Sequence, residues 1–213
     1  MTASRRYQDE PLTLIVPGFG GSGADHWQTH WESEQENCHR VELGMWEAPQ
    51  TAIWADRLGS AISEASRPLI LVAHSLGCHA VAWWNMLERS GARNVLGALL
   101  VAPPDVENVP FSSALSPFAP VVRARLPFPS ILVASRNDPW ANYGESKRMA
   151  RIWGSRLIDA GPLGHINADS GIRNWPYGKF LLRRLISATA PSQVPLLHGG
   201  AIETLSASAG SIR

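Results

Sequence analysis

One short stretch, residues 69–87, constrains the fold of this chain more than any other part. The apolar run Leu69–Ala73 predicts a buried strand. It leads into Ser75, which has the small residues Ala73 and Gly77 two positions to either side. Apolar residues then recur at helical spacing, at Ala80, Val81, Trp83, Trp84 and Leu87. A strand, a sharp turn with a serine and a helix together form the context of a nucleophile elbow.

Such a turn would lift the Ser75 hydroxyl above the carboxyl end of a sheet. The following helix would point its N-terminus at the serine, and the free N–H groups there favour a developing oxyanion. The commoner pattern has glycine at both flanking positions, and Ala73 departs from it while remaining small enough to fit. The alternative is an ordinary strand, loop and helix with an incidental serine.

Short apolar runs alternate with helical patterns along the chain. This alternation predicts a single α/β domain with a mostly parallel sheet of about six strands and helices on both faces. The expected strands are Leu12–Val16, His39–Leu43, Leu69–Ala73, Val95–Ala102, Ser130–Ser135 and Arg156–Ala160. Sites in such sheets lie at the carboxyl ends of the strands.

Five helices are expected between and after these strands. The first has Asp25 as its N-cap and carries Trp27 and Trp31 on one face, and the second covers residues 51–65. The third follows the elbow, and the last two cover 143–153 and 172–186. We expect a loose N-terminus at 1–10, the domain at 11–190 and a flexible C-terminal tail at 191–213, where small and polar residues dominate.

Composition excludes several classes of protein. Of the 213 residues, 45 % are hydrophobic and the net charge is +1, so neither nucleic acid nor a membrane is an expected partner. The two cysteines, Cys38 and Cys78, lack metal-site spacing and predict free thiols in a reducing compartment. Arg5 and Arg6 precede an apolar run of only five residues, too short for a signal peptide or a membrane span. We therefore expect a cytoplasmic protein.

Three polar residues follow three different strands. Ser75 follows the third strand, Asp138 the fifth and His165 the sixth. A serine hydroxyl needs a base, and the base needs an orienting carboxylate. The chain order serine, acid, histidine is the order expected on an α/β-hydrolase sheet. The backbone N–H groups of Leu76 and Phe19 are the candidates for an oxyanion hole, because Gly18 and Gly20 let the backbone near Phe19 approach a substrate.

Each of these residues has a plainer interpretation. Asp138 precedes Pro139, a pattern also typical of a simple turn, and His165 lies in a turn where surface histidines are common. Two other acids compete with Asp138, but Asp159 lies inside an expected strand and Asp169 follows the histidine. We interpret His74 as structural and pointing away from Ser75, and His79 as a packing residue.

No metal or cofactor is expected. His26 and His30 are four residues apart, but no third ligand of compatible spacing accompanies them. The glycine-rich loop 18–23 resembles a phosphate cradle, yet it lacks the Lys-Ser/Thr of a P-loop and the full dinucleotide fingerprint.

Four segments together resemble a known family: residues 18–27, Ala73–Gly77, Ser135–Pro139 and Gly164–Asn167. They are similar to the small cap-less serine hydrolases of the α/β-hydrolase superfamily, the family that includes the retinoblastoma-binding hydrolase. The resemblance extends from about residue 12 to residue 185. It implies that Ser75, Asp138 and His165 are nucleophile, acid and base, that small esters or amides are hydrolysed, and that no cofactor is needed. Many members have His-Gly where this chain has Pro17-Gly18.

The segment 103–129, between the fourth and fifth strands, is too short for a helical cap. We therefore expect a shallow, open site for an uncharged acyl group. Its candidate apolar lining residues, which could equally be core, are Phe19, Trp46, Phe111, Phe118 and Trp140. The function expected is hydrolysis of small carboxylic esters, with amides or thioesters also possible. Acyl transfer or a lyase step by the same triad, or a non-catalytic interaction module, are the alternatives. The sequence gives no oligomeric state.

Overall fold

The computed structural model of the protein describes residues 10–88 and 94–189. The expected loose N-terminus and flexible tail lie outside the described residues, apart from Glu10. The two cysteines, Cys38 and Cys78, are free and buried, as their spacing predicted.

The six expected strands form one sheet. Their bounds are β1 Leu12–Val16, β2 Cys38–Arg40, β3 Leu69–His74, β4 Val95–Val101, β5 Ser130–Ala134 and β6 Arg156–Asp159. The order across the sheet is β2-β1-β3-β4-β5-β6, and every neighbouring pair is parallel. The predicted α/β class and parallel sheet are confirmed.

Burial explains why the central strands could be predicted from their apolar sequences. Every residue of β3 and β5 is buried, and so are all but one of β4. A strand covered on both faces consists almost entirely of apolar residues, which gives a continuous run. The edge strands β2 and β6 are partly exposed, and β2 is only three residues long, ending before the expected His39–Leu43 run does.

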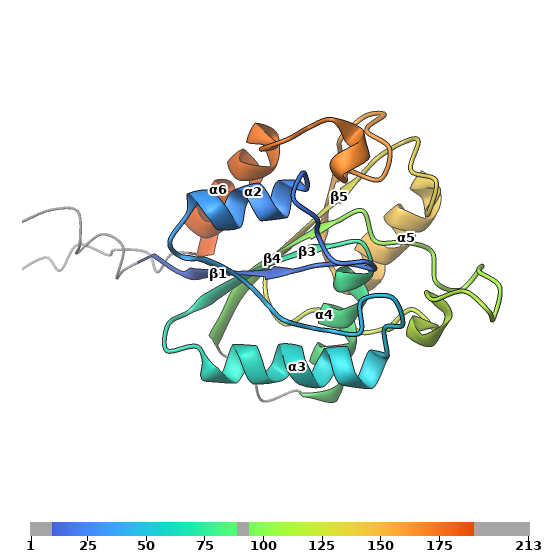
Figure 1. The fold of residues 1–213 in the computed structure, drawn as a ribbon, viewed down its shortest axis with the longest axis horizontal. Coiled ribbons are helices and arrows are strands. Elements are labelled where there is room, and N and C mark those ends of the chain that lie inside the picture. Colours follow the sequence, from blue (N-terminus) through green and yellow to red (C-terminus); the bar gives the residue numbers. More distant parts are fainter. Residues whose placement is uncertain (1–9, 89–93, 190–213) are drawn as a thin grey trace, which may run out of the picture.

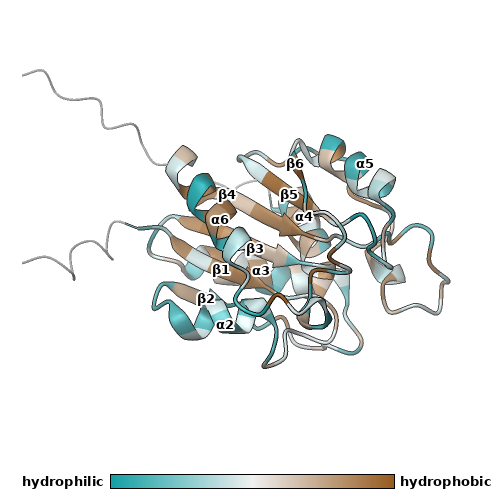
Figure 2. Cartoon of the chain, turned by 90° about the horizontal axis from the view of Figure 1, so that it is seen from above, coloured by the Kyte–Doolittle hydropathy of each residue, from teal (hydrophilic) through white to brown (hydrophobic). Residues whose placement is uncertain are grey.

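Helices cover both faces of the sheet (Figure 1). Their bounds are α2 Trp27–Glu34, α3 Thr51–Glu64, α4 Leu76–Leu87, α5 Tyr143–Trp153 and α6 Pro176–Thr189. Helices α3, α4 and α5 share one hydrophobic cluster with the sheet, and α2 and α6 share the other. Figure 2 shows hydrophobic colour concentrated in the strands and hydrophilic colour on the outer helices.

Two helices begin at different residues from those expected. The N-cap of α2 is His26, whose side chain accepts a hydrogen bond from the Gln28 N–H, and not Asp25. The last helix begins at Pro176 and not at Ile172. Proline suits the first helical position, because the N–H that it lacks has no partner within the helix there.

The segment 103–129 is mostly irregular, as expected. Its only helical turn among the described residues is the 3₁₀ turn η2, Ser116–Phe118, and it adds no cap domain. None of the helices in the described part of the chain is both long and apolar enough to cross a bilayer.

Candidate active site

Ser75 occupies a strained turn at the carboxyl end of β3. Its φ is +53°, a value that non-glycine residues rarely adopt. The Ser75 N–H donates to the Val101 carbonyl, so pairing with β4 continues up to the turn. A Cβ added at Gly77 would lie 2.4 Å from the Val16 carbonyl oxygen, which shows why this flanking position must be glycine.

Three side chains from three strand ends form a hydrogen-bonded chain. His165 Nε2 lies 2.8 Å from Ser75 Oγ. On the other side of the ring, His165 Nδ1 lies 3.0 Å from both carboxylate oxygens of Asp138. The side chains of His165 and Asp138 are only 10 % and 3 % exposed, so water hardly competes for these bonds. Neither Asp159 nor Asp169 takes the place of Asp138, because Asp159 instead binds Arg136 and Asp169 contacts Asn167.

Hydrogen bonds between the loops after β5 and β6 hold His165 above Asp138. The Ser135 hydroxyl accepts from the Leu163 N–H at 2.9 Å. The Asn137 side-chain oxygen accepts from the Gly164 N–H at 2.7 Å and from the Ser135 hydroxyl at 2.9 Å. The residues directly before His165 are thereby fixed to those directly before Asp138.

The glycine-rich loop after β1 packs directly against the elbow. A Cβ added at Gly18 would lie 2.7 Å from the Ser75 Cβ and 3.2 Å from the Leu76 nitrogen. Leu76 is the first residue of α4, and the N–H groups of a helix's first turn have no partner inside the helix. The two backbone segments expected to supply the oxyanion hole are therefore in contact.

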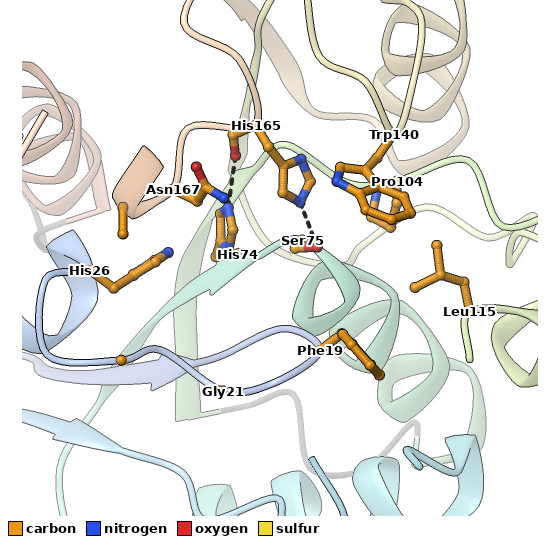
Figure 3. Close-up of a pocket in the computed structure, with 12 residues that line it drawn as sticks. Phe19, Gly21, His26, His74, Ser75, Pro104, Leu115, Trp140, His165 and Asn167 are labelled. Atoms are coloured by element: carbon orange, nitrogen blue, oxygen red, sulfur yellow. Dashed lines mark hydrogen bonds between the residues drawn. The ribbon is translucent and has the colours of Figure 1, made fainter. Parts of the chain in front are cut away.

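A cavity of about 300 Å³ opens over Ser75 (Figure 3). Figure 3 shows Ser75 and His165 at its centre, with different side chains to either side. We call one side the apolar wall; it consists of Phe19, Pro104, Leu115 and Trp140. The other side, the polar wall, consists of Gly21, His26, His74 and Asn167. Gly23 and Ala168 also line the cavity.

The expected lining was met at two positions and missed at three. Phe19 and Trp140 line the cavity, and both are about half exposed. Phe118 is fully buried in the core against Trp54, and Trp46 packs on Trp54 as well. Phe111 is 97 % exposed. Leu115, just before η2, lines the cavity, whereas Phe118, within η2, is a core residue.

His74, which was expected to be structural and to point away from Ser75, lines the cavity and contacts His165. Its Nε2–H donates to the His165 carbonyl at 2.9 Å, and its ring packs 5.0 Å from the His165 ring. Burial, with smaller contributions from His26 and His165, holds the pKa of His74 well below its usual value. The ring is therefore neutral and supports the backbone of His165.

His79 packs in the core, as expected, and holds the segment 103–129. Its Nε2–H donates to the Pro104 carbonyl at 2.9 Å. Burial lowers the pKa of His79 to about 4, so this ring is neutral too.

The histidine pair considered as metal ligands is not arranged for that role. His26 Nδ1 is occupied by the Gln28 N–H at 3.2 Å. Within residues 10–88 and 94–189, no group of three or more His, Cys, Asp or Glu side chains is placed to hold a metal ion.

Comparison with known proteins identifies the family. A family model for serine hydrolases matches residues 13–184. The chain belongs to the serine hydrolase family. No curated protein sequence matches it.

Solved structures share the fold of this serine hydrolase. A YdeN-like hydrolase of Pectobacterium atrosepticum is 27 % identical over 88 % of this chain and 97 % of its own, with a TM-score of 0.76. The ydeN gene product of B. subtilis is 20 % identical over 83 % of this chain and 99 % of its own, with a TM-score of 0.66. An N-formylmaleamic acid deformylase of Pseudomonas putida is 12 % identical over 81 % of this chain and 91 % of its own, with a TM-score of 0.62. The resemblance to α/β-hydrolases is confirmed, and hydrolase activity is supported.

Sequence reasoning missed several residues that shape the site of this serine hydrolase. Pro104, Leu115 and Asn167 line the cavity. Gln28 is fully buried, and its amide donates to the Val72 carbonyl at 3.0 Å, which ties α2 to the sheet. Gln28 could have been found from the sequence, because it lies on the same helix face as Trp27 and Trp31. Leu115 lies in an irregular segment, where no periodicity indicates its position.

Proposed function

We propose that this serine hydrolase cleaves small, uncharged carboxylic esters through an acyl-enzyme. The observation that carries the proposal is the chain of hydrogen bonds from Asp138 through His165 to Ser75. A carboxylate can only accept, so Asp138 fixes the proton of His165 on Nδ1 and leaves the Nε2 lone pair free for the Ser75 hydroxyl.

Each step then has a defined proton path. Ser75 Oγ attacks the ester carbonyl while its proton passes to His165 Nε2, and the resulting tetrahedral oxyanion accepts from the Leu76 and Phe19 N–H groups. His165 next protonates the departing alcohol as the carbon–oxygen bond breaks. Water repeats the sequence on the acyl-enzyme and releases the acid, which returns Ser75 to its starting state.

The lining supports an uncharged substrate. Of the twelve described residues that line the cavity, none is Lys, Arg, Asp or Glu, and four form the apolar wall. A charged group would lose its hydration there without gaining a partner, which is costly. Amides and thioesters pass through the same tetrahedral geometry and remain possible further substrates.

A fluorophosphonate probe tests the proposal, because it reacts with a serine that a base has activated. We expect the wild type to be labelled, and Ser75→Ala and His165→Ala to lose labelling and at least about 10⁴-fold in kcat/KM for p-nitrophenyl butyrate. Ser146→Ala, a buried serine on α5 outside the cavity, is the matched control and should be labelled as the wild type is.

The same assay examines the substrate charge. A neutral butyrate ester should be preferred to a succinate half-ester of the same alcohol by about tenfold or more. Absence of labelling in the folded wild type, or labelling that survives Ser75→Ala, would contradict the proposed nucleophile. Equal kcat/KM values for the two esters would contradict the substrate class alone.

A further inference from the structure

His26 contributes a polar group that the proposed mechanism does not use. Its ring lines the polar wall of the cavity, and the residue is only 5 % exposed. Figure 3 shows the outer end of the ring turned toward the space beside Asn167 and His74. Asn, Asp or Ser would serve better as the N-cap of α2, so capping alone does not explain a histidine here.

The hydrogen bonds of His26 fix which nitrogen carries the proton. Nδ1 accepts from the Gln28 N–H at 3.2 Å, so Nδ1 holds a lone pair. Burial, followed by the positive charge of Arg40, lowers the pKa of His26 to about 3. The ring is therefore neutral, and in a neutral imidazole the other nitrogen, Nε2, bears the hydrogen.

That Nε2–H is a buried donor without an acceptor. Within the described part of the chain it has no hydrogen-bond partner. Buried polar groups are nearly always paired, and an unpaired one destabilises the folded state. An unpaired donor in the wall of the cavity that also holds Ser75 is the arrangement expected where a ligand supplies the missing acceptor.

We infer that the His26 Nε2–H binds an uncharged acceptor oxygen of the substrate, so that the preferred ester carries an ether or carbonyl oxygen in the part that faces the polar wall. This inference rests on the proposed ester hydrolysis. The rest of the substrate lies against the apolar wall, with Ser75 and His165 between the two (Figure 3). An ester with alkyl groups on both sides would leave the Nε2–H unpaired.

The test compares esters that differ only by an oxygen in place of a methylene. In the first pair the change is in the acyl group, p-nitrophenyl 3-methoxypropanoate against p-nitrophenyl pentanoate. In the second pair it is in the alcohol, 2-methoxyethyl butyrate against butyl butyrate. For each pair the ratio of kcat/KM values, ether over alkyl, is measured in the wild type and in His26→Asn.

His26→Asn keeps the cap and removes the ring donor. The asparagine oxygen can accept from the Gln28 N–H, but the side chain is too short to replace Nε2. We expect the ratio for one of the two pairs to fall by about tenfold. His30→Asn makes the same substitution on α2 outside the cavity lining and should leave both ratios unchanged. His26→Ser, another good cap, should repeat the result.

A measurement on the wild type complements the variants. Phosphonate adducts of Ser75 that carry either a 2-methoxyethyl or a butyl group differ only in the acceptor oxygen. We expect the His26 Nε2 proton, observed by NMR in protein with ¹⁵N-labelled histidine, to lie further downfield in the methoxyethyl adduct.

The outcomes separate the inference from the function on which it rests. If both ratios are unchanged in His26→Asn, or the Nε2 proton has the same shift in both adducts, the inference is wrong and ester hydrolysis stands. An equal loss toward all four esters would make His26 a purely structural residue and would also overturn it. If no ester is hydrolysed in a Ser75-dependent manner, the proposed function itself fails.

Discussion

Two segments enclose Ser75, and they are held in place by different interactions. The loop after β1 consists mostly of glycine and is fixed by polar groups: the Ser22 carbonyl accepts from Arg40 at 2.7 Å and from Thr29 at 2.9 Å. The Ser22 hydroxyl donates to Gln28 at 2.6 Å. Because Gly18 has no side chain, this loop can lie against the serine.

The segment 103–129 is fixed chiefly by burying its own apolar side chains. Phe118, Val121 and Val122 belong to the core on the α3–α5 side of the sheet. Indole N–H groups from the helices pair with its carbonyls, as Trp83 does with Phe118 and Trp153 with Val122, both at 3.0 Å. A segment held in this way presents carbon atoms to the cavity, which accounts for two members of the apolar wall, Pro104 and Leu115.

Because the two segments are held by different interactions, different kinds of substitution should disturb them. Backbone position is critical in the glycine loop, because Gly18 packs directly against Ser75. Side-chain volume is critical in the segment 103–129. Substitutions in the two regions should therefore affect different kinetic constants.

The largest effect should come from the glycine loop. The methyl group of Gly18→Ala would lie 2.7 Å from the Ser75 Cβ, so either the loop or the serine must move. A displacement of about 1 Å at a reacting group costs roughly 100-fold in rate. We expect kcat to fall by about that factor for every ester, with a parallel fall in the rate of fluorophosphonate labelling.

Gly23→Ala is the matched substitution in the same loop. Gly23 also lines the cavity, but a Cβ there would meet no atom of residues 10–88 and 94–189 within 4 Å, so activity should stay within about twofold of the wild type. If both alanine variants were equally impaired, close packing against the serine would not be the reason why Gly18 matters.

The sequence predicted the parts of this site that depend on the sheet. The strands β3, β4 and β5 are buried on both faces, and their apolar runs were unmistakable. Once the strands were placed, the positions of Ser75, Asp138 and His165 followed, since the carboxyl ends of parallel strands meet at one edge. The hydrogen bonds that join these residues agree with that placement.

The lining could not be predicted in the same way. In the irregular segment 103–129 no periodicity indicates which side chains point inward, so Phe118 was expected in the cavity and Leu115 was not. The cap of α2 was missed for a different reason. Asp25 has the better intrinsic preference for a cap, but tertiary packing of the His26 ring against His74 and Trp27 prevails.

A buried neutral histidine lies in or behind each side of the cavity, His26 at the polar wall and His79 beneath Pro104. The pH dependence of the free energy of unfolding tests whether the fold keeps these rings neutral. His26 and His79 have pKa values lowered to about 3 and about 4, chiefly by burial. In the unfolded chain these histidines titrate near pH 6.5. Below that pH the unfolded state binds protons that the folded state does not. Stability is therefore full above about pH 6.5 and is lost as the pH falls toward 4.

Each such group should contribute a slope of about 1.4 kcal/mol per pH unit to the free energy of unfolding. We expect His79→Gln to reduce the slope of the wild type between pH 6 and pH 4.5 by about one such contribution, and His26→Asn to do the same. Urea denaturation at several pH values measures it. His39→Gln, at an exposed position, is the control. An unchanged slope in His79→Gln would show that this ring is not held neutral by the fold.

The smallest effect should come from the apolar wall, where only contact area changes. Leu115→Ala removes three carbon atoms from the cavity wall, and each buried carbon group is worth about 0.8 kcal/mol, or roughly fourfold in kcat/KM. We expect the preference for a butyl over a methyl group to fall by about fivefold to tenfold, in the acyl or in the alcohol part of the ester. Methyl compounds, which do not reach the wall, should be hydrolysed nearly as before.

Phe111→Ala is the informative partner of this variant, because it removes a larger apolar side chain from the same segment. Its ring is 97 % exposed and lies outside the cavity lining, so the preference for butyl should not change. A shift in chain-length preference with Phe111→Ala but not with Leu115→Ala would mean that the substrate contacts the tip of this segment. The apolar wall would then be assigned to the wrong residues, whereas the polar wall and the position of Gly18 would be unaffected.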